Sequence, residues 1–452
     1  QARYIDASSS RSSSQLQLSN LALALVSPRY VGYGRKRKLA TSGLIQTTFA
    51  AGYQKQASYK RVTRASAYNQ YSSITDAFAE SANGQFPSDL SLFDFGGLAW
   101  ETYAINLLAG QENEYFGSGV GGNLDQNIRI TESGNRGTFF AAVGLNFDDV
   151  IYVGATVTGL SLRHNYRWQF VEEDINDLHN FLEDNPNSTF PLEYPMNSLL
   201  ARDSIVTTGN GVSGKLGVIV KPNNNVRVGI SFQLPGILLN NEIYRREMLH
   251  VRTLVDQTGQ DSIGFEPRAT GEAQGSYNLI TPYGFSVGGT YLFGKQGFVT
   301  ADLEVVDYTS ARLRSPYLED DPFYYNYATE NDRIANFYQP AMNVSLGGEY
   351  RADMIRLRAG AGYRGSALTE EARTYENPEA PGETLIADLT GMVYSAGLGV
   401  RGESAFMDIA FQHQTTKSKM SPYATSDPAG FDPTLLTTQA TNRIMLTLGV
   451  KW

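Results

Sequence analysis

Hydrophobic and polar residues alternate with a period of two along most of this chain. Near the C-terminus every second residue is apolar, namely Ile444, Leu446, Leu448, Val450 and Trp452. Because successive side chains of a β-strand point to opposite faces, this pattern predicts a strand with one apolar face. A terminal aromatic on such a strand is typical of membrane barrels, whose aromatic residues gather at the two membrane interfaces.

The same alternation recurs along the chain and predicts thirteen strands. They are expected near 15–28, 41–60, 126–147, 150–168, 200–221, 226–250, 272–293, 298–312, 340–351, 355–366, 389–402, 405–416 and 440–452. A single-chain bacterial membrane barrel has an even number of antiparallel strands. We therefore interpret residues 2–8 as the tail of a first strand, which gives about fourteen strands in all.

The connections between these strands alternate between two lengths. Short polar turns are predicted at 146–149, 221–225, 294–297, 351–353 and 402–404, and long loops near 61–123, 169–198, 251–271, 313–339, 367–388 and 417–439. A soluble β-sandwich also alternates, but it has no reason to sort its loops by length. The pattern favours one all-β domain over 1–452, a transmembrane antiparallel β-barrel. Residues 1–14 are then the remnant of the first strand or of a connection to a hatch.

Three stretches of the long loops have a helical pattern instead. Residues 73–84 begin with a capping Ser73, have Asp76 three residues later and end at Asn83-Gly84. Residues 98–108 and 173–182 are two further candidates. The apolar stripes of these helices either pack on one another or form an exposed patch that captures an apolar ligand at the cell surface.

Composition narrows the function without identifying it. The 452 residues carry a net charge of −9 and contain no cysteine. No run approaches the roughly 20 apolar residues of a transmembrane helix, and no basic stripe indicates a nucleic-acid partner. The four histidines, His164, His179, His250 and His413, lack metal-ligand spacing. We expect no enzyme activity, no metal and no cofactor. Export of a barrel implies a signal peptide, and no such pattern is seen here.

The alternation also predicts which charged residues face the lumen. If the apolar face meets lipid, the lumen receives Arg227, Asp302, Glu304, Glu349, Arg356, Arg358, Arg364, Asp408, Arg443 and Lys451. These charges either neutralise one another and support the wall, or they bind a ligand. In the second interpretation Arg356, Arg358 and Arg364 receive an anionic headgroup such as a carboxylate.

The apolar part of such a ligand would be held by the long loops. The candidate residues lie on the helix predicted over 173–182 and share one face of it: Ile175, Leu178, Phe181 and Leu182.

Several stretches resemble the FadL/TodX family of outer-membrane transporters for long-chain fatty acids and other hydrophobic compounds. They are residues 73–84 with 97–106, then 140–155, 281–289, 302–308 and 357–366, and the resemblance extends from about residue 15 to 452. The family implies a fourteen-stranded barrel, an N-terminal hatch in the lumen, and passive passage with lateral escape into the membrane. A hatch sequence is apparently absent here, since nothing before residue 15 is long enough.

The expected function is therefore a passive outer-membrane channel for hydrophobic or amphipathic small molecules such as long-chain fatty acids. Its partners would be the lipid bilayer and the ligand, and other outer-membrane proteins are a further option. The alternative is a structural or adaptor barrel in a larger outer-membrane assembly. A third interpretation is an ordinary porin for polar solutes.

Overall fold

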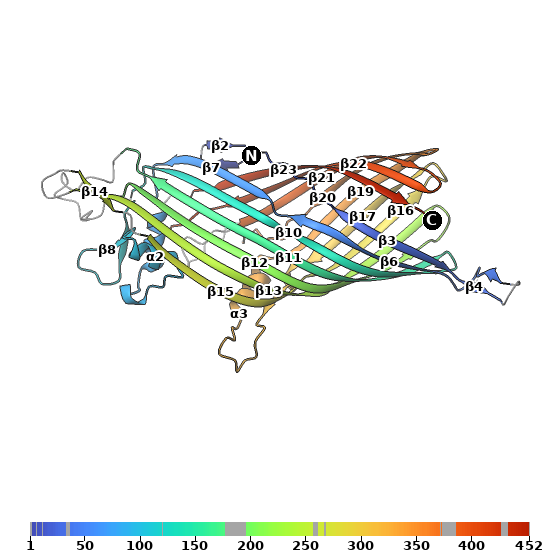
Figure 1. Cartoon of the computed structure of the whole chain (residues 1–452), viewed down its shortest axis with the longest axis horizontal. Helices are drawn as coiled ribbons and strands as arrows, with labels where there is room; N and C mark the ends of the chain where they lie inside the picture. Colours follow the sequence, from blue (N-terminus) through green and yellow to red (C-terminus); the bar gives the residue numbers. More distant parts are fainter. Residues whose placement is uncertain are drawn as a thin grey trace.

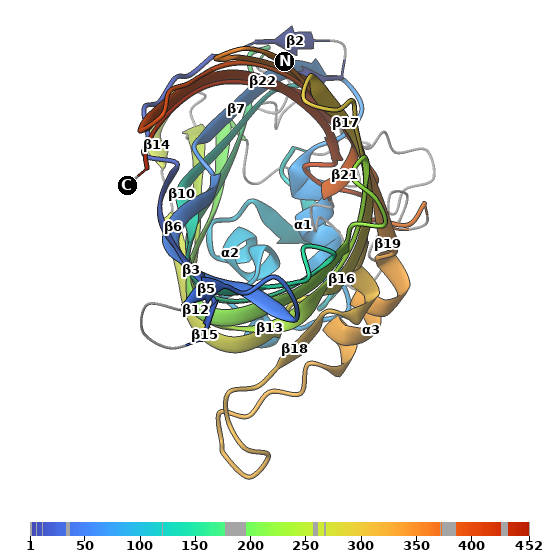
Figure 2. The same cartoon turned by 90° about the vertical axis from the view of Figure 1, so that its right-hand side faces the viewer.

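One large antiparallel sheet forms the wall of the molecule in this computed structural model (Figure 1). The structure describes the chain except for residues 1, 6, 11, 33–36, 120, 177–195, 256–260, 266–267, 371, 373–385, 426–432 and 452. Viewed from the end with the short turns, the strands form a ring (Figure 2). In the described residues no helix is long and apolar enough to cross a membrane.

The strands follow one another around the wall in chain order, each antiparallel to the next. They are β3 (Asn20–Pro28), β6 (Leu44–Ser58), β7 (Arg61–Asn69), β10 (Leu124–Phe147), β11 (Ile151–Glu173), β12 (Ser198–Val220), β13 (Val226–Val255), β15 (Arg268–Ile280), β16 (Tyr283–Leu292), β17 (Gly297–Asp307), β18 (Arg312–Arg314), β19 (Pro340–Ala352), β20 (Ile355–Arg364), β21 (Ile386–Arg401), β22 (Ala405–Met420) and β23 (Leu435–Val450).

The 19 strands of the sheet correspond to fewer crossings of the wall. Three crossings are split in two, at β6–β7, β15–β16 and β17–β18. The short β1 (Ala2–Tyr4), β2 (Ala7–Ser9) and β14 (Asp261–Phe265) do not cross the wall. Thirteen crossings remain, and β1 pairs antiparallel with the first residues of β23. The barrel-type architecture predicted from the alternation is confirmed.

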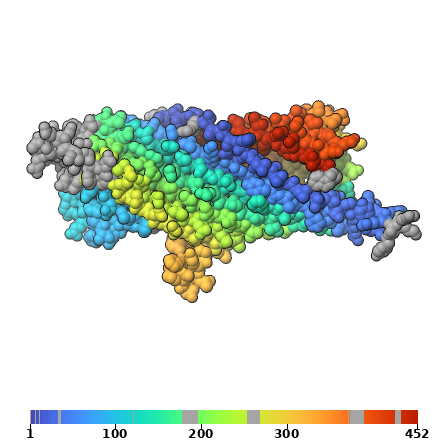
Figure 3. Space-filling view, viewed as in Figure 1, coloured from blue at the N-terminus to red at the C-terminus, as the bar shows by residue number. Residues whose placement is uncertain are grey.

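The ring is not closed by hydrogen bonds along its full height. In the described chain β3 pairs only with β6, and β23 pairs with β22 along its length and with β1 over Leu435–Thr437. All nine residues of β3 are exposed, and Ile444 and Leu448 are 76% and 69% exposed. Figure 3 shows a hollow between these blue and red edges.

Outward side chains change from apolar to polar part-way up the wall. On β11 the lower outward residues Ile151, Val153 and Val157 are apolar and exposed, whereas higher up the outward positions are polar, such as Arg163 and Arg167. At about 3.3 Å per residue and a tilt near 40°, the apolar part spans roughly 18 Å on β11 (Ile151–Val157) and roughly 23 Å on β10 (Phe139–Phe147). We call it the apolar band. Its height is that of the lipid-facing band of a membrane barrel.

The upper part of the wall encloses a packed core. Here the inward residues of β10–β13 are the apolar ones, such as Trp168, Phe170 and Leu199, and all three are buried. They pack against residues 70–119, which we call the plug: α1 (Ile74–Ala82), η2 (Pro87–Asp89), α2 (Phe95–Glu101), β8 (Ile105–Leu107) and β9 (Tyr115–Gly117). Figure 2 shows α1 and α2 inside the ring, at the far end.

Two of the helix predictions can be scored. Ser73 caps α1 and forms the expected capping box with Asp76, so the prediction over 73–84 is confirmed. The prediction over 98–108 is wrong in its bounds, because α2 ends at Glu101 and Ile105–Leu107 is a strand. Most of 173–182 lies outside the described residues. The sequence pattern missed α3 (Ala328–Phe337) and the short η3 (Tyr308–Ser310).

Candidate functional site: the lumen below the plug

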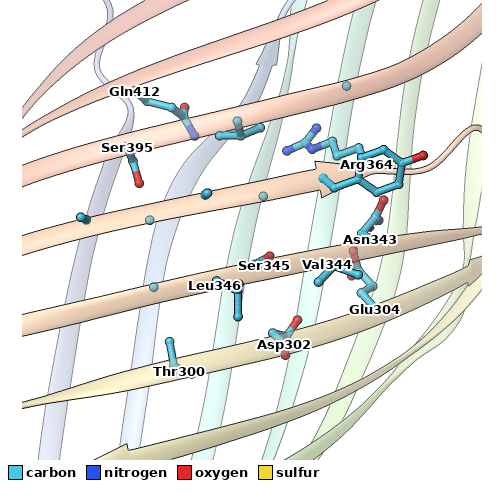
Figure 4. Close-up of a pocket in the computed structure, with 18 of the residues that line it drawn as sticks. Thr300, Asp302, Glu304, Asn343, Val344, Ser345, Leu346, Arg364, Ser395 and Gln412 are labelled. Carbon is cyan, nitrogen blue, oxygen red and sulfur yellow. Dashed lines mark hydrogen bonds between the residues drawn. The ribbon is translucent and has the colours of Figure 1, made fainter.

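A cavity of about 1230 Å³ lies inside the wall, next to β17, β19, β20 and β21. Its lining combines inward polar residues of these strands with small residues and a few apolar side chains. Figure 4 shows Arg364, Asn343 and Glu304 together at one end, and Thr300 and Asp302 farther along. The lining contains many polar residues because, in each strand, they alternate with the outward apolar residues and therefore face inward.

The register of three strands places a row of polar residues at the Arg364 end. Glu304, Asn343 and Arg364 are direct cross-strand neighbours. Asn343 donates a hydrogen bond from Nδ2 to Glu304 Oε2, at 2.9 Å. Arg364 makes no hydrogen bond or ion pair with any residue that the structure describes. Its guanidinium thus faces the cavity with its donors unused.

The other two predicted arginines have protein partners. Arg358 donates to Glu349 at 2.8 Å and to Asp408 at 2.7 Å. Arg356 donates to the backbone oxygen of Ile355 at 2.9 Å and lies 4.0 Å from Glu349. Arg351 and Arg401 complete this network, through Glu349 at 2.7 Å and Asp408 at 2.9 Å. Two carboxylates are thus shared among four arginines along the wall.

The structure adds a cation that the sequence analysis did not single out. Arg136 on β10 lines the same cavity and has no hydrogen-bond or ion-pair partner within the described part of the chain. Alternation around the outward Phe139 is the sequence pattern that would place Arg136 inward. This pattern is hard to follow near Arg136, because the strand is interrupted there by Gly134, with φ of 113°, and by a register shift.

The predicted apolar ligand residues are not brought to this cavity. Ile175 follows β11 at the upper rim and is 61% exposed. Leu178, Phe181 and Leu182 lie outside the described residues. The apolar stripe of α1, which was a second candidate for capturing ligand, is buried: Phe78 stacks on Phe95 with ring centres 5.2 Å apart. For α1 the structure supports internal packing over ligand capture.

The plug is fastened to the wall by three polar contacts. Glu172 of β11 accepts hydrogen bonds from the Ser73 hydroxyl at 2.6 Å and from the Ile74 N–H at 2.9 Å, at the start of α1. His250 Nδ1 lies 2.9 Å from the carbonyl oxygen of Thr102, at the end of α2. Arg246 donates to the carbonyl oxygen of Phe93 at 2.7 Å. These contacts hold the plug inside the upper part of the wall.

Neither catalysis nor metal binding is indicated at these contacts. In the described chain no group of histidines, aspartates and glutamates could hold a metal ion. Burial lowers the pKa of His250 to about 4, so the ring is neutral and anchors α2.

Several solved structures are similar to this chain, among them the following three. A Pseudomonas aeruginosa FadL homologue has a TM-score of 0.40 and 14% identity, covering 72% of this chain and 74% of that one. The P. putida toluene transporter TodX has 0.39 and 11%, with 96% and 88% covered. The monoaromatic hydrocarbon channel CymD has 0.36 and 13%, with the same shares covered. No family model and no curated protein matches the sequence.

The fold of this chain resembles that of FadL-type channels. The resemblance read from the sequence is thus found again among solved structures.

Proposed function

We propose that this protein is a passive outer-membrane channel for hydrophobic or amphipathic small molecules, with long-chain carboxylates as its preferred class. The apolar band supports a position in a bilayer, because a lipid-facing Arg or Lys at mid-depth would cost roughly 2–4 kcal/mol. The cationic residues of the same strands, such as Arg358 and Arg364, face the lumen instead.

The observation that carries the proposal is the unpaired Arg364 at the end of a cavity large enough for a lipid-like molecule. A guanidinium binds a carboxylate through two parallel hydrogen bonds. The small and apolar residues of the lining that face inward, such as Val393 and Ala410, would contact the chain of the ligand. Entry from outside requires the plug to move, since the plug fills the upper lumen.

Binding of a fluorescent long-chain carboxylate to the purified protein tests this assignment. A charge-assisted hydrogen bond contributes about 1.5–3 kcal/mol, so Arg364→Gln should weaken binding by roughly 10- to 100-fold. Binding of the matching long-chain alcohol should change little, because the alcohol carries no charge.

Arg401→Gln is the matched control. It removes the same charge from a residue that pairs with Asp408 and does not line the cavity, so carboxylate binding should persist. The assignment is wrong if Arg364→Gln binds the carboxylate as tightly as the unmodified protein, or if acid and alcohol lose affinity equally.

A further inference from the structure

Residues 315–327 leave the barrel sideways. They connect β18 to α3 and extend away from the axis of the ring, while the plug fills its interior (Figures 1 and 2). We call these residues the foot. Four large side chains of the foot are exposed to solvent: Tyr317 by 41%, Leu318 by 77%, Phe323 by 74% and Tyr325 by 53%. Exposed clusters of this kind mark sites of contact with a membrane or a protein.

The foot leaves the wall at the upper edge of the apolar band. On β17 and β19 the outward residues are apolar as far as Val305 and Met342, each of which lies two residues from the upper end of its strand. On the opposite side β11 continues through Glu173, well past its last exposed valine at position 157. The wall is therefore low beside the foot, and this loop begins where the band ends.

The base of the foot is fixed to the barrel. Asn331 of α3 accepts from the N–H of Leu313 at 2.8 Å and donates to its carbonyl oxygen at 2.9 Å. The hydroxyl of Tyr327 donates to the carbonyl oxygen of Ser276 on β15, at 3.3 Å. These contacts hold the loop against the outer side of the wall.

The tip of the foot is built from tight turns that present its apolar residues. The N–H of Asp321 donates to the carbonyl oxygen of Leu318 at 3.0 Å, and the Asp321 carboxylate accepts from the N–H of Phe323 at 2.8 Å. The rings of Tyr317 and Phe323 lie 5.9 Å apart. Leu318 and Phe323 thus both protrude from the tip, and both side chains would be stabilised on leaving water.

We propose that the foot rests on the outer surface of the bilayer, with Leu318 and Phe323 inserted among the acyl chains. The lipid surface is favoured over a protein partner because the foot is continuous with the apolar band and lies at its upper edge. Tyr317 and Tyr325 would then sit at headgroup level, where tyrosine is enriched. The acidic residues Glu319 and Asp320 would stay on the water side. The inference rests on the bilayer position assigned to the band.

Spin labelling in reconstituted bilayers tests the foot directly, because the chain has no cysteine and single cysteines can be labelled uniquely. Labels at Phe323→Cys and Leu318→Cys should be several-fold more accessible to oxygen, relative to a water-soluble nickel reagent, than a label at Ile175→Cys. Ile175 is the matched control, because it is equally exposed but lies on the high side of the wall.

Phe139→Cys, on the apolar band, separates failure of the foot from failure of the membrane assignment. If the label at 139 is more accessible to oxygen and the labels at 318 and 323 are more accessible to the nickel reagent, the foot does not contact the bilayer. The membrane position of the apolar band then still holds. Shielding of 318 and 323 from both reagents indicates a protein contact and also overturns the proposal for the foot. Greater accessibility to the nickel reagent at 139 overturns both the foot and the membrane position.

Discussion

At the scale of single residues, Glu172 shows how the plug is held. Its side chain is fully buried and accepts hydrogen bonds from Ser73, Ile74 and Gln126, the last at 2.7 Å. It lies at the upper end of β11, above the apolar band. Burial raises the pKa of Glu172 to about 7, against the hydrogen bonds that lower it, and nearby Asp76 raises it further. Because the carboxyl group of Glu172 ionises at a higher pH than usual, the stability of the plug depends on pH.

We predict that Glu172 stabilises the plug more at pH 5 than at pH 8, measured as the difference between the unmodified protein and Glu172→Gln, because the lowered pKa of His250 acts on stability in the opposite sense over this range. Since the pKa of Glu172 is higher in the folded plug than in an unfolded chain, the contribution is full below about 4.5 and is lost as pH rises through 7. The difference should be on the order of 1–3 kcal/mol. Urea unfolding followed by tryptophan fluorescence measures it, because Trp100 and Trp168 belong to this core.

Glu172→Gln is the control for this pH effect. It keeps an acceptor for Ile74 but cannot ionise, and it retains His250, so the unmodified protein should gain stability relative to the variant between pH 8 and pH 5. A stability difference between the two proteins that is the same at both pH values contradicts the role given to Glu172.

At the scale of elements, the plug is packed as a protein core rather than as loose loops. Gly97 of α2 lies so close to Ser91 that an added Cβ would come within 2.1 Å of the Ser91 carbonyl oxygen. That oxygen already accepts a hydrogen bond from the Asp94 N–H. The close approach leaves no room for a side chain at position 97.

Gly97→Ala should therefore loosen the plug, at a cost of roughly 1–3 kcal/mol for overpacking. Faster amide hydrogen exchange in peptides spanning 91–107 would show this. Gly275→Ala is the matched control, because no atom lies within 4 Å of its added Cβ and its backbone is extended. Equal protection of 91–107 in the two variants would rule out this account of Gly97.

Sequence patterns predicted some elements and not others for identifiable reasons. Alternation predicted the wall because lipid on one side and water on the other impose opposite requirements on neighbouring residues. α1 was predicted because its cap is local, in Ser73 and Asp76. α3 was missed because its residues are mostly polar and none is buried. Arg364 could be predicted to face inward, but only the structure shows that Arg358 has partners and that the Arg364 side chain has none among the described residues.

At the scale of the whole molecule, the wall is higher on one side than on the other. In the described chain its two edge strands, β3 and β23, are not paired with each other. β13 extends over 30 residues, whereas β20 has 10, so the plug is enclosed on one side and the foot emerges on the other. β3 and β23 are the first and thirteenth crossings, so an even number of reversals separates them and both run toward the short-turn end. A strand antiparallel to both would complete the ring, and β1 already pairs with β23 in that sense.

The central claim is that an amphipathic molecule occupies the lumen with its charged end at Arg364. A crystal structure with a long-chain carboxylate brominated at its far end tests it most directly, because the anomalous signal locates the chain. We predict the carboxylate within hydrogen-bond distance of Arg364 and the bromine inside the cavity between β17 and β21. Bromine found only on the outer apolar band, with the lumen free of ligand, would contradict the account.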